Sequence, residues 1–288
     1  RLRAWIDQDV DTNKLNEKSY SYKFRVNVNN DTAPINKSYA LEFAETNKGQ
    51  NGLEEVTHEI DNTLQVDSRF ATEYRYRGGN VNNYVTFNNE VWRIIGIIPT
   101  EDDSGNVENR FKIIKDEPVD KLKWNVTEDT ATSSYSNWIT ATLNTYLNTT
   151  YYNTLSEEAT TLIGTTKYYL GGYNSAGITT DMMWQYERKN NANRTPYYYN
   201  VNPIMQNDAS KKIALMYVSD YGYAASKSCI RDLNIYNEAA GCTKASNWLN
   251  RSENTWMLAQ SSVSSSSAYI IYEEGDVSCY EYVQRYLN

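Results

Sequence analysis

Alternation of hydrophobic and polar positions predicts β-strands at the start of the chain. The segments Arg1–Asp7 and Ser21–Val28 both have this period-two pattern, and Ser38–Phe43 is expected to add a third strand. Two or three strands cannot form a stable sandwich by themselves. Residues 1–45 are therefore expected to form a separate segment that packs on the rest of the chain or completes a sheet in another copy. The side chains expected at such a subunit contact are Leu2, Ala4, Ile6, Tyr22, Phe24 and Val26.

Residues 46–73 are expected to link this segment to a main domain at 74–288. Glu45–Gly52 has the composition of a flexible linker. In Leu53–Phe70, apolar residues recur every three to four positions, which predicts one short helix or a segment that follows the surface.

The main domain is predicted to begin with a β-meander. Val81–Phe87, Val91–Ile98 and Arg110–Lys115 have strand patterns. Asn88–Asn89 is expected to form the first turn, because Asn tolerates the left-handed backbone of tight hairpins, and Asp102–Gly105 the second. The side chains expected to face the core are Trp92, Ile94, Phe111 and Ile113.

Helices are predicted next. Asn137–Asn148 places Trp138, Leu143, Tyr146 and Leu147 near one helical face. Ser156 is a suitable N-cap for a second helix over Glu157–Ile163. Gly171–Asn202 is a long polar and aromatic insertion, and Lys211–Ser219 is predicted to be a buried strand.

The C-terminal stretch Ala245–Val277 contains a Trp-bearing strand, a serine-rich loop and a second strand. These strands are expected to pair with Tyr84–Ile98. That pairing would join the two ends of residues 74–288 into one large domain.

Composition narrows the classes of partner. The net charge of -8 argues against binding to nucleic acid or anionic membranes. The longest apolar run, Val91–Ile98, is far shorter than the roughly 20 residues of a membrane span. The sequence begins at Arg1 with neither an initiating Met nor a signal peptide, as expected of a processed or trimmed start. Its 26 tyrosines are typical of adaptable binding surfaces, but an AT-rich genome would produce the same bias.

The cysteines allow two interpretations. Cys229 and Cys242 enclose a polar loop, and they form either a disulfide, which export favours, or two buried thiols. Cys279 is then unpaired within this scheme. Zinc is not expected, because the only histidine, His58, lies far from the cysteines in sequence.

Neither a bound metal nor another cofactor is predicted. Asp7, Asp9 and Asp11 have the spacing of a calcium loop, but Thr12 replaces its glycine and Lys18 its final glutamate. A solvated acidic loop is the better interpretation.

No catalytic motif is apparent. With one histidine, a Ser-His-Asp or Cys-His site would depend on His58, and no nucleophile motif surrounds it. The carboxylate pairs are adjacent residues, which point to opposite faces of a strand or lie in solvated turns. The chain is therefore not expected to be an enzyme.

Two sets of motifs resemble known families. The hairpin LRAWID…YKFRVNV resembles the closing hairpin of the immunoglobulin-like sandwich in exported Firmicutes proteins of the TasA/camelysin-like group. In residues 74–288, the segments VTFNNEVWRIIG, NWITATLNTYLN, IALMYVSDYGYA, NWLN and TWMLAQSSVSSSSAYIIYEEGDVS resemble an uncharacterised domain of Firmicutes surface proteins. That domain is similar to C-type-lectin-like and formylglycine-generating-enzyme-like folds. Its usual G-V-R-P ending is not matched here, where Tyr282–Arg285 occupies the position.

The resemblance implies an α+β, mainly β fold, with a C-type-lectin-like domain preceded by strands of an immunoglobulin-like sandwich. It also implies a ligand-binding face on the C-terminal strands and the insertion. The alternative is that Trp256 and Tyr269 are core residues, which is the better interpretation for Trp256 because it lies in an apolar strand. The candidate ligand-binding residues are Trp184, Tyr186, Tyr197, Tyr199, Trp256, Tyr269, Tyr272, Glu273 and Tyr280.

The expected function follows from the two resemblances together. It is that of an exported bacterial cell-surface protein, a subunit of an extracellular fibre or pilus-like assembly carrying a lectin-like head. In this hypothesis the chain binds copies of itself through its N-terminal strands. The alternative is a monomeric adhesin that binds a glycan or a protein.

Overall fold

The computed structural model describes residues 38–102, 104–126, 138–172, 179–189, 204–205, 212–229, 233, 246–251, 253–260, 267–280 and 286–287. The two N-terminal strands and the calcium-like loop predicted in residues 1–37 lie outside these ranges. So do Cys242 and the candidate ligand-binding residues Tyr197 and Tyr199.

The central element is an antiparallel sheet built around the long strand β4 (Glu90–Glu101). One edge of β4 pairs with β3 (Tyr84–Phe87) and then with β2 (Thr72–Tyr76), which pairs with β1 (Leu53–Thr57). The other edge pairs along almost its whole length with β5 (Val107–Lys115). Among the described strands, β5 therefore lies at an edge of this sheet.

Turn chemistry explains the two hairpins of the sheet. Asn88 and Asn89, which join β3 to β4, have φ angles of 54° and 57°. This is the left-handed backbone that a two-residue hairpin requires. Between β4 and β5, the Asp102 carboxylate accepts backbone hydrogen bonds from Ser104 and Asn106, at 2.9 and 2.8 Å. Both predicted turns are confirmed.

The predicted inward face of the meander is also confirmed. Trp92 and Ile94 are buried, and Phe111 and Ile113 are partly buried against the core. Gly96 has a separate role, because a Cβ there would lie 2.1 Å from the backbone oxygen of Tyr74. Only glycine permits this close approach of β2 to the bent strand β4.

The segment before the sheet differs from prediction. Ser38–Phe43 was expected to be a strand, but α1 (Tyr39–Asn47) is a helix with Ser38 as its N-cap, accepting from the Leu41 amide at 3.3 Å. Its buried residues Ala40 and Ala44 are four apart, so one face packs against the sheet.

The linker predicted at Glu45–Gly52 is instead the end of α1 and a turn into β1. The helix predicted in Leu53–Phe70 is also wrong. That segment contains β1 and a 3₁₀ turn at Ser68–Phe70, because pairing with β2 outweighs a local helical spacing.

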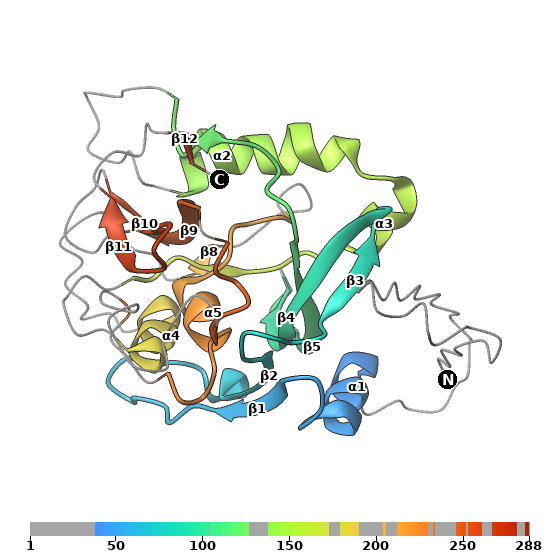
Figure 1. Ribbon diagram of the computed structural model, residues 1–288, viewed down its shortest axis with the longest axis vertical. Coiled ribbons are helices and arrows are strands. Elements are labelled where there is room, and N and C mark those ends of the chain that lie inside the picture. The colour runs from blue at the N-terminus through green and yellow to red at the C-terminus, as the bar shows by residue number, and fades with distance from the viewer. Residues whose placement is uncertain are drawn as a thin grey trace.

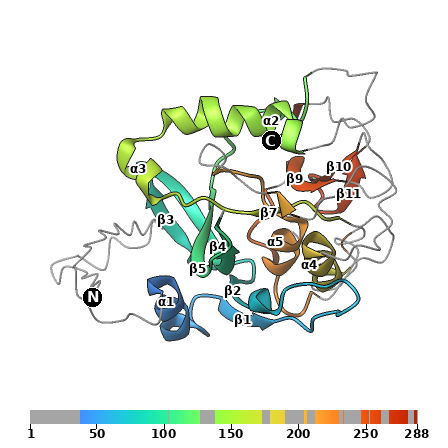
Figure 2. The ribbon, with the colours of Figure 1, turned by 180° about the vertical axis from the view of Figure 1, so that it is seen from behind.

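A helical layer covers one side of the sheet. It comprises a 3₁₀ turn Trp138–Thr140, α2 (Thr142–Tyr146), a π-helical turn Leu147–Tyr151, a 3₁₀ turn Tyr152–Thr154 and α3 (Glu157–Leu162). Ser156 caps α3 by accepting from the Ala159 amide, as predicted. Figures 1 and 2 show α2 and α3 on one side of β4 and β5, and α1 on the other.

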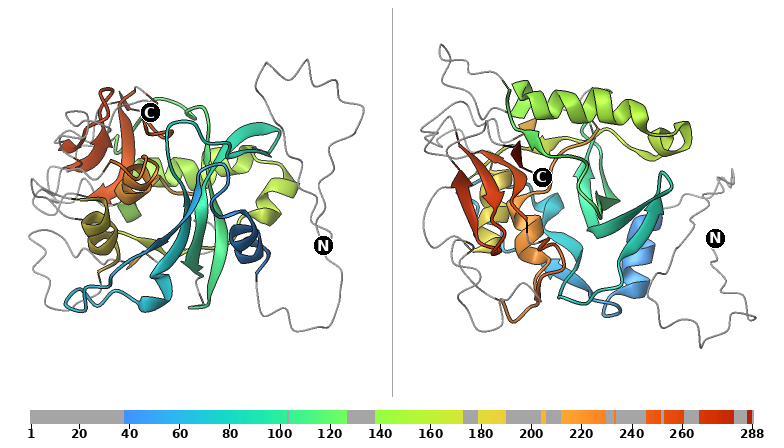
Figure 3. Two further views of the ribbon diagram at one scale, coloured as in Figure 1. Left: turned by 60° about the horizontal axis from the view of Figure 1, so that its bottom comes forward. Right: turned by 45° about the horizontal axis from the view of Figure 1, so that its top comes forward.

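The C-terminal strands form a separate sheet, so the predicted pairing with Tyr84–Ile98 is wrong. Strand β10 (Ala268–Ile271) lies between β9 (Thr255–Gln260) and β11 (Val277–Tyr280). Figure 3 shows this sheet beside α4 (Thr180–Arg188) and α5 (Val218–Tyr223), away from α1. The closure is made instead by a short pairing of β12 (Tyr286–Leu287) with β6 (Leu122–Lys123). A further short pair joins β7 (Tyr168–Tyr169) to β8 (Ile204–Met205).

The buried strand predicted at Lys211–Ser219 is also wrong. Residues 212–217 belong to no strand, and α5 begins at Val218. The Asn148 side chain takes the place of a strand partner, since its Oδ1 accepts from the Lys212 and Ile213 amides, at 2.5 and 2.8 Å. Its Nδ2 donates to the Ile213 oxygen at 2.7 Å.

The described elements thus combine helices with antiparallel sheets, which confirms the α+β class. Helices take a larger share than the mainly β pattern predicted.

Candidate functional site

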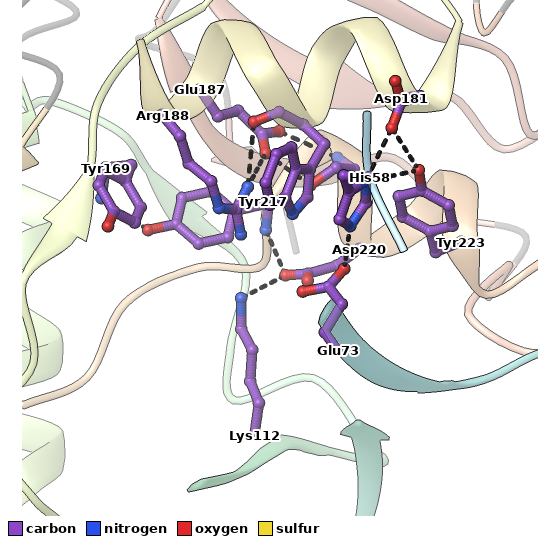
Figure 4. A network of polar contacts seen from close by, with 12 residues as sticks. His58, Glu73, Lys112, Tyr169, Asp181, Glu187, Arg188, Tyr217, Asp220 and Tyr223 are labelled. Carbon is purple, nitrogen blue, oxygen red and sulfur yellow. Dashed lines mark hydrogen bonds and ion pairs between the residues drawn. The ribbon is translucent and has the colours of Figure 1, made fainter. Parts of the chain in front are cut away.

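A network of buried charged side chains joins the central sheet to α4 and α5 (Figure 4). The imidazole of His58, which is buried, lies 2.7 Å from Asp181 Oδ1 through Nδ1 and 3.1 Å from Glu73 Oε1 through Nε2. Its ring stacks on the indole of Trp184, with 3.6 Å between the ring centroids. The hydroxyl of Tyr223 donates to Asp181 at 3.1 Å.

The network continues as a chain of alternating charges. Arg75 donates to Glu73 at 2.7 Å and to Asp220 at 2.5 Å. The second oxygen of Asp220 accepts from Lys112 Nζ at 2.5 Å and from the Tyr217 amide at 2.7 Å. Burial tends to raise the pKa of Asp220, but Lys112 and Arg75 outweigh it and hold that pKa below its usual value. Asp220 is therefore a buried carboxylate bound by two cations.

A second branch of the network lies between α4 and α5. Glu187 accepts from the Ser219 amide at 2.9 Å and from its hydroxyl at 2.5 Å, and Arg188 lies 3.2 Å away. Burial raises the pKa of Glu187 to about 7, although Arg188 and Ser219 favour the charged form.

These contacts explain how the fold tolerates so many buried charges. Buried charges are tolerated when they are paired and hydrogen-bonded, and each acid named here has a cationic or hydrogen-bonding partner. They connect β2, β5, α4 and α5, in addition to the apolar packing that these elements share.

A cavity of about 840 Å³ runs along β5. Every residue from Glu108 to Lys115 lines it, together with residues of the helical layer and of segment 212–217. Tyr39 and Leu162 also line it and are 44% and 58% exposed. Exposed apolar side chains at an opening of this kind are typical of interaction sites. The other apolar lining residues are Phe87, Trp92, Ile95, Ile98, Phe111, Ile113, Ile114, Val119, Leu122, Leu143, Leu147, Leu155, Ile163, Ile213, Leu215, Met216 and Trp256.

The outer backbone edge of β5 is open in its middle. In an antiparallel ladder, successive residues direct their N–H and C=O groups to opposite sides. Asn109 lies opposite Pro99, which has no N–H, and its carbonyl accepts from Ser38 Oγ at 3.3 Å. The backbone N–H and C=O groups of the odd-numbered residues of β5 thus point away from β4.

At the far end of the same edge, the carbonyl of Lys115 accepts from Arg251. Among the described residues, no hydrogen bond reaches the outward backbone groups of Phe111 and Ile113 between these two ends. We call the cavity together with this open edge the β5 groove.

The groove contains charges of both signs. The Lys and Arg side chains lining it are Arg110, Lys112, Lys115, Lys167, Arg188, Lys212 and Arg251, and the acids are Glu101, Glu108, Glu117 and Asp120. Burial lowers the pKa of Lys112, although Asp220 favours its charged form. Lys112 therefore connects the groove to the buried network.

The predicted ligand-binding residues do not form one exposed face. Trp184, Trp256 and Tyr269 are buried core side chains, which corrects their assignment as exposed ligand contacts. Trp256 packs against Trp124 and donates to the Leu122 oxygen at 3.1 Å, as the alternative core interpretation expected. Tyr186 and Tyr272 are half-buried and Glu273 is exposed, whereas the side chain of Tyr280 lies outside the described residues.

Sequence reasoning missed both the charged network and the β5 groove. No partner was predicted for His58, because Glu73 and Asp181 lie 15 and 123 positions away in the sequence. Cys229 is buried, while Cys242 lies outside the described residues, so their disulfide stays a prediction.

The described residues contain no group of His, Cys, Asp and Glu side chains suited to a metal ion. None of their helices has the length and apolar character needed to cross a membrane.

Comparison with known proteins identifies no relative: the chain matches no family model, no curated protein and no solved structure. The β5 groove is therefore interpreted from its own geometry.

Proposed function

We propose that this chain is a non-catalytic subunit of a bacterial extracellular assembly, and that the β5 groove receives a strand from another copy. The observation that carries the proposal is the open edge of β5 beside an apolar cavity. Export to the cell surface and a C-type-lectin-like head belong to the same proposal and are supported by the motif resemblance alone.

Strand addition fits both components of the groove. An added strand forms main-chain hydrogen bonds to an open sheet edge, and pockets for its alternate side chains supply specificity. The outward amides and carbonyls of Phe111 and Ile113 provide the first component, and the apolar walls provide the second. Unprotected edges are also a hazard, because they pair with other chains indiscriminately. Here Ser38 and Arg251 bind the backbone carbonyls at the two ends of the β5 edge, and they thereby limit the length of an added strand.

The position of α1 supports a contact through the N-terminal segment. Ser38 is bonded to Asn109 at one end of the open edge, so the chain preceding Ser38 starts beside the groove. That segment contains the alternating apolar residues expected of an added strand.

The experiment blocks the edge without disturbing the ladder to β4. Asn109→Pro removes one outward N–H, which proline lacks, and Asn109→Ala is the matched control that keeps it. Purified proteins are examined by negative-stain electron microscopy and by light scattering after size-exclusion chromatography. We expect regular fibres or oligomers from the wild type and the Ala variant, and monomers from the Pro variant with an unchanged melting temperature. Discrete monomers from all three proteins would overturn the proposal.

The second candidate function is a monomeric adhesin. The volume of the cavity favours it, since about 840 Å³ lies within the range of roughly 300–1,000 Å³ typical of small-ligand sites. A monomeric wild type that binds defined glycans or peptides, with binding lost when Leu215→Trp fills the groove, would support this candidate instead.

A further inference from the structure

The dimensions and apolar walls of the β5 groove indicate which segment occupies it. We infer that Tyr22–Val28 of a second copy adds to β5 in the antiparallel direction. This inference rests on the proposed function and specifies its partner.

The lengths of the two segments agree. From one closed end of the edge to the other, the residues with outward backbone groups are Asn109, Phe111, Ile113 and Lys115. This stretch is about 20 Å long at roughly 3.3 Å per residue. Tyr22–Val28 spans the same number of residues. Its apolar residues at every second position would all face one side of the added strand, toward the cavity.

Side-chain size selects this segment over the other N-terminal strand. Arg1–Asp7 would direct Leu2, Ala4 and Ile6 to one face, and alanine contributes little volume. The Tyr22, Phe24, Val26 and Val28 face is larger and includes two aromatic rings. A wide apolar cavity is filled better by the larger set, because unfilled space in a packed interface forfeits contacts.

Ladder geometry favours the antiparallel direction. Antiparallel ladders are slightly more stable per residue than parallel ones, and β5 already pairs with β4 in this way. In that direction Val28 lies near Asn109 and Tyr22 lies near Lys115.

The connection between the added segment and α1 limits how far apart the two can lie. Residues 29–37 separate Val28 from Ser38, and nine residues span at most about 30 Å when fully extended. Exchange of an identical element between copies is a low-cost route to assembly, and a repeated head-to-tail exchange extends into a fibre.

Photo-crosslinking of the full chain tests the partner directly. The photoreactive amino acid p-benzoylphenylalanine replaces Phe24 in ¹⁵N-labelled protein, which is mixed with unlabelled protein, assembled and irradiated. Mass spectrometry should find mixed-isotope crosslinks from position 24 to peptides of β5 or of the groove wall. The same probe at Trp5, in the other N-terminal strand, should give no crosslinks to these peptides.

A matched pair of charge variants provides the second measurement. Phe24→Asp places a carboxylate on the apolar face, and Asn27→Asp places the same charge on the polar face. We expect the first to lower the assembled fraction at least tenfold and the second to change it less than twofold, with equal melting temperatures. An equal effect of both variants would overturn the inference.

The crosslinks distinguish failure of the exchange between copies, failure of the assigned segment and failure of the proposed function. Crosslinks only within one copy would show that the segment closes its own groove and would overturn the exchange. Fibres without crosslinks from position 24 to the groove would overturn this partner while leaving assembly intact. Absence of any assembly would instead contradict the proposed function itself.

Discussion

The replacement Asp220→Asn tests whether the buried charged network stabilises the fold. Asp220 is 1% exposed and binds Arg75 and Lys112 at 2.5 Å each. Asparagine has nearly the same shape and keeps one oxygen for the Tyr217 amide, but it removes the negative charge between two cations. Removing one partner of a buried ion pair typically costs about 3–5 kcal/mol. We expect a loss of about 3 kcal/mol, a large part of the roughly 5–15 kcal/mol that stabilises a typical domain.

The assay is urea unfolding followed by the fluorescence of the seven tryptophans. Glu59→Gln is the control, because it removes the same charge from an exposed side chain and should change stability by less than about 0.5 kcal/mol. In a protein that already carries Lys112→Met, Asp220→Asn should lower the free energy of unfolding by less than it does in the wild type. One of the two cations that Asp220→Asn leaves unpaired is then absent. A coupling free energy of about 1–3 kcal/mol is expected from this double-mutant cycle.

The pH dependence gives a further check. Because the folded-state pKa of Asp220 is held below its unfolded value, its contribution is present above the unfolded pKa and is lost as pH falls through the folded pKa. The difference between wild type and Asp220→Asn should therefore shrink below about pH 4. A loss of less than about 1 kcal/mol at pH 7, or a difference that grows in acid, would refute the stabilising role.

Three other predictions concern single positions. Glu187 has a folded-state pKa of about 7, raised from its unfolded value near 4.5, so the folded state binds more protons and wild-type stability should fall as pH rises from about 4.5 to 7. Glu187→Gln should remove most of this pH dependence of the free energy of unfolding, which amounts to up to about 3 kcal/mol. An unchanged pH dependence in urea titrations would contradict the raised pKa of Glu187. Gly96→Ala should cost more than about 2 kcal/mol in the same assay, because its Cβ would meet the Tyr74 backbone oxygen at 2.1 Å, whereas a loss below about 0.5 kcal/mol would show that β2 moves freely. At Asn89, with φ 57°, replacement by Gly should be neutral or stabilising and replacement by Val should cost about 1–2 kcal/mol; equal melting temperatures of the two variants would argue against the left-handed turn.

The sequence by itself determined the features that depend on neighbouring residues. The Asn88–Asn89 and Asp102–Gly105 turns, the Ser156 cap of α3 and the inward face of the meander were all predicted correctly. Each arises from backbone preferences or from alternation within a few residues, and such signals are readable in one segment at a time.

Tertiary structure decided the features that depend on distant partners. Packing of Ala40 and Ala44 in the core made a helix of the segment predicted as a strand. An Asn148 side chain replaced a strand partner beside residues 212–217. The C-terminal strands found partners in each other rather than in β4.

The candidate site belongs almost wholly to this second group. The alternating pattern of β5 predicted a strand, but its position at the sheet edge depends on which strands occupy the other side of β4. His58, Glu73, Arg75 and Asp220 had no sequence signal, because their pairing joins residues up to 145 positions apart. Local propensity governs turns and caps, whereas the burial of charge and the opening of an edge follow from the packing of the whole chain.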